Sequence, residues 1–210
     1  MKHSIPLGWG LGICSLLAPL PLLGIELETL EESLKRELLS GKIVALEKRP
    51  DESSEVDARF VTLAQILTGT QKEFWEVIHD KEDAELFVDG VLESKVLEES
   101  DTEILVEQKT KVGGPKGAYY YQLRHTLTPF HRSDFEFVTG EIKNVLGTWW
   151  ILEGPEPDQS LVIYSLHIDP GIFAPQFVVQ RGMKKSMPGT LQSMQREVLK
   201  RRESTGNESE

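Results

Sequence analysis

The stretch Gly147-Thr148-Trp149-Trp150-Ile151-Leu152 and the stretch Leu161-Val162-Ile163-Tyr164-Ser165-Leu166-His167-Ile168-Asp169-Pro170-Gly171 decide the fold of this chain. Both are rich in β-branched and aromatic residues, and a turn containing Gly and Pro separates them. The segment that follows, to about Arg202, has the apolar spacing of a long amphipathic helix. Two β-rich runs followed by one long helix predict a curved sheet wrapped around a helix, with a largely apolar space between them.

Upstream, the chain has further strand and helix patterns, so the predicted fold class is α+β with a curved antiparallel sheet. Thr70 followed by Glu73 is a capping box, which predicts the start of a helix. Pro188 interrupts the long closing helix and predicts a kink near Met187. The expected strands are 43–47, 59–67, 91–98, 103–109, 118–128, 132–139, 145–152 and 161–168, and the expected helices are 26–40, one from Thr70, a short turn at 83–87, and about 174–200.

Two sequence phrases resemble a known family. One is the G-x-W of residues 147–149 with the Y-x-L-x-x-D-P-G of residues 164–171, and the other is Glu73-Phe74-Trp75-Glu76-Val77-Ile78-His79-Asp80. Together with the order of elements, they resemble the START-like (SRPBCC) superfamily over about residues 58–200, in the branch of polyketide cyclases and coenzyme-Q-binding START-domain proteins. The resemblance implies a helix-grip fold with a hydrophobic ligand cavity, but it does not name the ligand, because one fold holds many functions.

The chain divides into four segments. Residues 1–24 carry Lys2 and then an apolar run without charge, which indicates a secretory signal peptide or, if it is not cleaved, a signal anchor. Residues 25–57 predict a helix and strand extension, with Leu38 or Leu39 as the anchor of the helix. Residues 58–202 form the expected START-like domain, and the polar residues 203–210 are expected to be a disordered tail. We therefore expect an exported protein, periplasmic or secreted.

Composition excludes some function classes. The 210 residues carry a formal charge of −11, with 39% hydrophobic and 27% charged residues. This acidity argues against nucleic acid as a partner and against electrostatic docking onto anionic lipid, although transient membrane contact stays open. Cys14 is the only cysteine and lies in the signal segment, so the remaining chain offers neither a disulfide nor a thiol nucleophile. The oligomeric state is left open.

The residues that face the cavity follow from strand periodicity. Successive side chains in a strand alternate between faces, and the more apolar set is assigned to the inside. The missing side chain of Gly147 lets the sheet bend or the helix come close. The candidate ligand-binding residues are Tyr119, Tyr121, Leu123, His125, Phe135, Phe137, Trp149, Ile151, Tyr164 and Leu166 on strands, with Phe177, Met187 and Leu191 on the closing helix.

Polar motifs give little support for catalysis. The five histidines form no metal-ligand pattern, and there is no nucleophile elbow, phosphate loop or dinucleotide fingerprint. We therefore assign no catalytic residue, no metal and no cofactor. His125 is predicted to point inward and could donate a hydrogen bond to a ligand. The leading hypothesis is a non-enzymatic binder of a lipid, quinone or polyketide-like compound; the alternatives are a polyketide cyclase or aromatase, and an interaction module with a vestigial pocket.

Overall fold

The computed structural model describes residues 30–47, 49–50, 60–111, 117–171 and 175–207. The predicted signal segment at residues 1–24 lies outside the described residues, as does the start of the predicted N-terminal helix. No helix in the described part of the chain is both long and apolar enough to span a membrane.

The described strands form a single eight-stranded antiparallel sheet with the order β1-β2-β8-β7-β6-β5-β4-β3. The two stretches that dominated the sequence become β7 and β8, which pair over their whole length near the middle of the sheet. The strands are β1 Val44–Leu46, β2 Val61–Thr68, β3 Val91–Glu99, β4 Glu103–Thr110, β5 Tyr119–Thr128, β6 Arg132–Gly140, β7 Asn144–Glu153 and β8 Gln159–Asp169.

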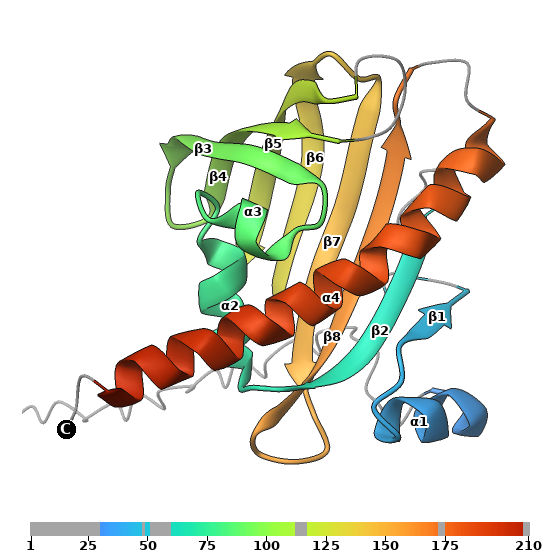
Figure 1. Cartoon of the computed structure of the whole chain (residues 1–210), viewed down its shortest axis with the longest axis vertical. Helices are drawn as coiled ribbons and strands as arrows, with labels where there is room; N and C mark the ends of the chain where they lie inside the picture. The colour runs from blue at the N-terminus through green and yellow to red at the C-terminus, as the bar shows by residue number, and fades with distance from the viewer. Residues whose placement is uncertain (1–29, 48, 51–59, 112–116, 172–174, 208–210) are drawn as a thin grey trace, which may run out of the picture.

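The long helix α4, Gln176–Asn207, crosses one face of the curved sheet and packs against β2 and β8 (Figure 1). The short helices α2, Gln71–His79, and α3, Ala84–Phe87, lie on the same side and contact α4. The sheet and α4 therefore form the predicted helix-grip α+β fold. The helix continues through Pro188 and past the predicted end at about residue 200, so residues 203–207 are helical rather than a disordered tail; residues 208–210 lie outside the described residues.

The other face of the sheet carries a smaller apolar cluster. Helix α1, Glu32–Leu39, places the fully buried Leu38 on it, while Leu39 is 52% exposed. The expected anchoring of the N-terminal helix is thus made by Leu38. The buried members of this cluster are Leu38, Val44, Ala64, Trp150, Leu161 and Ile163.

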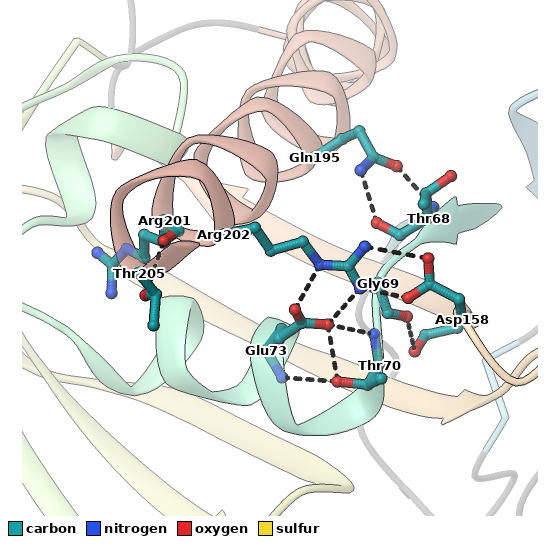
Figure 2. Close-up of polar contacts among 10 residues, drawn as sticks. Thr68, Gly69, Thr70, Glu73, Asp158, Gln195, Arg201, Arg202 and Thr205 are labelled. Atoms are coloured by element: carbon teal, nitrogen blue, oxygen red, sulfur yellow. Dashed lines mark hydrogen bonds and ion pairs between the residues drawn. The ribbon is translucent and has the colours of Figure 1, made fainter. Parts of the chain in front are cut away.

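A polar clamp fixes the C-terminal half of α4 to the corner between β2 and α2 (Figure 2). Thr70 and Glu73 make the predicted capping box. The Arg202 guanidinium donates to the carboxylates of both Glu73 and Asp158. About two turns earlier, the Gln195 amide exchanges two 2.7 Å hydrogen bonds with the backbone of Thr68. These contacts set how far α4 stands from the sheet.

Candidate functional site

A cavity of about 470 Å³ lies between the concave face of the sheet and α4. Strands β4 to β8 supply its floor, α3 closes one side, and α4 covers it. The volume lies within the range of about 300–1,000 Å³ that is typical of small-molecule sites. Most of its lining side chains are apolar, so it suits a hydrophobic guest.

Eight of the thirteen predicted residues lie on the wall of this cavity. Seven come from β5 to β8, because alternation along these strands sends every second side chain to the concave face. They are Tyr121, Leu123, His125, Phe135, Trp149, Tyr164 and Leu166, and α4 adds Met187. Their contact with a ligand stays a prediction.

Four other predicted residues are inside the fold but do not line the cavity. Tyr119, Ile151 and Leu191 are buried in the core, and Phe137 is partly buried against it. Ile151 lies where α2 packs against β7, and Leu191 is completely buried under α4. All four side chains lie in or against the core, as predicted, and at Ile151 and Leu191 direct helix–sheet packing fills the space.

Phe177 was placed on the inward stripe of the closing helix, and this prediction is wrong. Its side chain is 70% exposed. Phe177 lies ten positions before Met187, which at about 100° per residue turns it roughly 80° away from the buried stripe. Met183, four positions before Met187, lies on that stripe and contacts the cavity instead, and the half-buried Val179 also lines it.

The missing side chain of Gly147 makes room within the sheet, whereas we expected it to let the sheet bend or the closing helix come close. A Cβ at this position would lie 2.1 Å from the ring of Phe135 and 2.5 Å from the carbonyl oxygen of Ser165. The missing side chain therefore admits the Phe135 ring, which lines the cavity, rather than the helix.

His125 is the one predicted polar residue buried deep in this wall, with 5% of its surface exposed. Its Nδ1 lies 3.3 Å from the Ser133 hydroxyl, and its ring packs 5.5 Å from that of Phe135. Its Nε2 has no hydrogen-bond partner among the described residues. Burial, together with the positive charge of Lys81, holds the pKa of His125 well below its usual value, so the ring is neutral near pH 7.

Lys81 is a functional candidate that the sequence did not reveal. It belongs to the run Asp80-Lys81-Glu82-Asp83, which has the composition of a solvated turn. In the structure it is 4% exposed and lines the cavity from the connection between α2 and α3. Burial lowers the pKa of its ammonium to about 7. No residue in the described ranges gives its side chain a hydrogen bond or an ion pair.

Two tyrosines complete the polar part of the wall. The Tyr121 hydroxyl donates to Thr110 Oγ1 at 2.9 Å, and burial raises its pKa. Tyr164 stacks on Trp149 with ring centres 3.8 Å apart and an interplanar angle of 4°. Burial, and then the neighbouring Tyr121, also raise the pKa of Tyr164. Both phenols therefore stay protonated at physiological pH and can act as hydrogen-bond donors or as apolar surface.

Metal chemistry has no support in the described part of the chain, where no group of three or more His, Cys, Asp or Glu side chains could hold an ion. The site is thus an apolar cavity with a small polar region around Lys81 and His125.

The comparison with protein families agrees with this geometry. Residues 69–195 match the family described as polyketide cyclase/dehydrase and lipid transport. This chain belongs to that family. The START-like resemblance of the sequence is confirmed, and this polyketide cyclase and lipid transport domain is a hydrophobic ligand-binding fold. No curated protein matches the chain at a significant level.

Solved structures of this superfamily share the fold. The Zhui aromatase/cyclase from Streptomyces sp. R1128 is 16% identical with a TM-score of 0.58, covering 68% of this chain and 94% of its own. The STAR-related lipid transfer protein from Xanthomonas axonopodis is 18% identical with a TM-score of 0.58, covering 74% and 92%. A START superfamily protein from Mycobacterium smegmatis is 10% identical with a TM-score of 0.59, covering 67% and 97%. At these identities the likeness shows the fold alone.

Proposed function

We propose that this protein binds and carries a hydrophobic small molecule, such as a lipid, a quinone or a polyketide-like compound, in the cavity beneath α4. The observation that carries the proposal is the cavity itself: about 470 Å³ of space with a mainly apolar wall inside an otherwise packed domain. Protein interiors normally pack without such voids, so a space of this size is most simply explained as room for a guest.

The energetics of such binding are adequate. Burying a tail of about ten methylenes contributes roughly 8 kcal/mol gross, at about 0.8 kcal/mol for each, before the costs of association. Met183 and Met187 lie in the roof of the cavity. Their flexible side chains can adapt to guests of different shape.

The test is displacement of an environment-sensitive apolar fluorophore, with the cavity narrowed by Leu166→Trp. Leu166 lines the cavity from β8, so the larger ring should occupy the ligand space and weaken probe binding by on the order of tenfold or more. Leu97→Trp is the matched control, because Leu97 is 39% exposed on β3 and lines none of the described pockets. The proposed carrier function would be refuted if the folded wild-type protein did not bind the probe, or if the two variants weakened probe binding equally.

A cyclase-type enzyme is the second candidate. Such an enzyme would need polar groups that converge inside the cavity, and Lys81 and His125 are such groups. Turnover separates the two functions: a carrier returns a polyketide-like substrate unchanged, whereas an enzyme converts it and loses rate by on the order of a hundredfold in His125→Ala.

We further propose that the protein is exported. The support is the apolar run within residues 1–24, which has the composition of a signal segment. N-terminal sequencing of the native protein should begin near Ile25 if the signal is cleaved. An intact Met1 on protein recovered from the cytoplasm would contradict export.

A further inference from the structure

Lys81 is an unusual member of the cavity wall because its charge is buried without a counter-charge. The side chain is 4% exposed, and nothing among the described residues forms an ion pair or hydrogen bond with it. Burying an unpaired ammonium costs several kcal/mol, so such groups in proteins are normally paired or functional. Since the described residues supply no partner, a bound ligand is the natural source of the counter-charge.

Of the acidic groups nearest in sequence, Asp80 and Asp83 already pair with Arg201. Lys81 also borders a surface cleft that contains Glu76, His79, Asp80, Glu82 and Glu99. Of these, Asp80 pairs with Arg201 at 3.1 Å, Glu76 lies 3.7 Å from Lys72, and Glu99 lies 4.0 Å from His79. On the cavity side, the other charged residues of the wall are Asp89 and Lys111. None of these carboxylates makes an ion pair with Lys81.

His125 points to the same part of the cavity. It is close enough to Lys81 for the lysine charge to lower its pKa, and both residues line the cavity. The Nδ1 atom of the neutral ring can accept a hydrogen bond from the Ser133 hydroxyl, and Nε2 then carries the N–H. That Nε2 has no hydrogen-bond partner among the described residues. The cavity wall therefore holds an unpaired N–H donor of His125 close to the unpaired ammonium of Lys81.

We propose that Lys81 and His125 together bind an acidic oxygen, so that the guest of this cavity is an apolar carboxylic acid, such as a fatty acid. The Lys81 ammonium and the His125 Nε2–H meet the carboxylate. The tail extends over Leu123, Phe135 and Trp149 beneath Met187. This inference rests on the proposed carrier function and adds the chemical class of the ligand.

The pairing stabilises both partners. A carboxylate within hydrogen-bond distance supplies the counter-charge that Lys81 lacks, and charge-assisted hydrogen bonds are stronger when water is excluded. An alcohol or an ester of the same length would bury the same tail but would leave the ammonium without its counter-charge. The acid should therefore bind more tightly than either neutral analogue.

The experiment compares lauric acid, lauryl alcohol and methyl laurate as competitors of the apolar fluorophore at about pH 6, where Lys81 is mostly protonated and the acid is ionised. In the full chain, lauric acid should bind on the order of tenfold more tightly than the two neutral compounds. Lys81→Met should abolish this preference while the fluorophore still binds. The matched control is Lys184→Met, which removes an exposed lysine of α4 that lines none of the described pockets and should keep the preference.

The outcomes separate the two proposals. Equal affinity of acid, alcohol and ester in the wild type, or a preference that survives Lys81→Met, would overturn this inference and leave the carrier function standing. If the fluorophore binds but none of the three compounds competes with it, this inference falls and the carrier function stands; if the fluorophore itself does not bind, both proposals fall. Lys81→Met is expected to fold, because an apolar side chain of similar length replaces an unpaired buried charge.

A second measurement uses the unaltered protein. In the nuclear Overhauser spectrum of bound lauric acid, the methylene next to the carboxyl group should contact the His125 ring, and the terminal methyl should not. The reverse pattern would place the tail against the polar residues and would overturn the proposal.

Discussion

Replacing Arg202 by Met removes the guanidinium that ties the C-terminal part of α4 to two separate segments of the chain. Arg202 donates to Glu73, at the start of α2, and to Asp158, in the turn before β8 (Figure 2). Glu73 also accepts from the Thr70 backbone as part of the capping box. The variant should therefore loosen α4 and weaken the helix cap at the same time.

The expected loss in free energy of unfolding can be worked out from the pKa of Glu73. The pKa of Glu73 is lowered from 4.5 to about 2, chiefly by the hydrogen bonds from Arg202; burial opposes this, and the hydrogen bonds from Thr70 add to the lowering. At about 1.36 kcal/mol per pKa unit this sets an upper limit of roughly 3 kcal/mol. The Glu73 side chain is 27% exposed, and solvent screening of such pairs reduces the expected loss to about 1–2 kcal/mol.

The ion pair between Arg202 and Glu73 also predicts how the free energy of unfolding depends on pH. Because the pKa of Glu73 is lower in the folded chain, its contribution is fully present above about pH 4.5 and is lost as the pH falls toward about 2. The difference in free energy of unfolding between wild type and Arg202→Met should shrink across that window.

The assay is urea unfolding followed by tryptophan fluorescence at pH 7 and at about pH 3. Arg196→Met is the matched control, because Arg196 lies on the same helix and its guanidinium donates to Ser193 one turn earlier. A loss in Arg202→Met no larger than that of the control, or a loss that stays constant between the two pH values, would refute the reasoning.

Three further predictions follow from single positions. Gly147→Ala should destabilise the fold by about 1–3 kcal/mol, measured by urea unfolding, since the new Cβ would collide with Phe135 and with the Ser165 carbonyl; an unchanged midpoint would contradict this packing. Gly182→Ala should stabilise α4 by about 1 kcal/mol in the same assay, because its Cβ would meet nothing within 4 Å, and a destabilised variant would argue against a helix there. The imidazole signals of His125 should keep their neutral chemical shifts from about pH 8 to pH 6, and titration in that range would contradict its burial.

The sheet and its closing helix could be predicted from the sequence because their signals are local. The alternation in Tyr119–Thr128, the β-rich run in Asn144–Glu153 and the Thr70–Glu73 capping box depend on neighbouring residues alone. Helical spacing predicted Leu38 or Leu39 as the anchor of α1, and the structure buries Leu38. The family resemblance then supplied the helix-grip topology, which the structure confirms.

The wrong or missing predictions concern residues whose environment is set by contacts with distant parts of the sequence. Phe177 was misplaced because polar and apolar residues are mixed around α4. The sequence therefore does not define which side of the first turn is buried. Residues 203–207 lack apolar side chains, yet the helix continues through them from the clamp at Arg201 and Arg202. Lys81 could not be found, because a lysine between three acidic residues has the local signature of a solvated turn, and only the fold shows that it faces a cavity.

The most direct test of the central claim is a crystal structure of the protein soaked with a bromine-labelled medium-chain fatty acid, read from the anomalous signal of the bromine. The cavity between β5–β8 and α4 should contain the bromine peak, among Leu123, Trp149 and Met187. A fully occupied bromine peak on the outer face of the sheet, or an empty cavity at saturating ligand, would contradict the account.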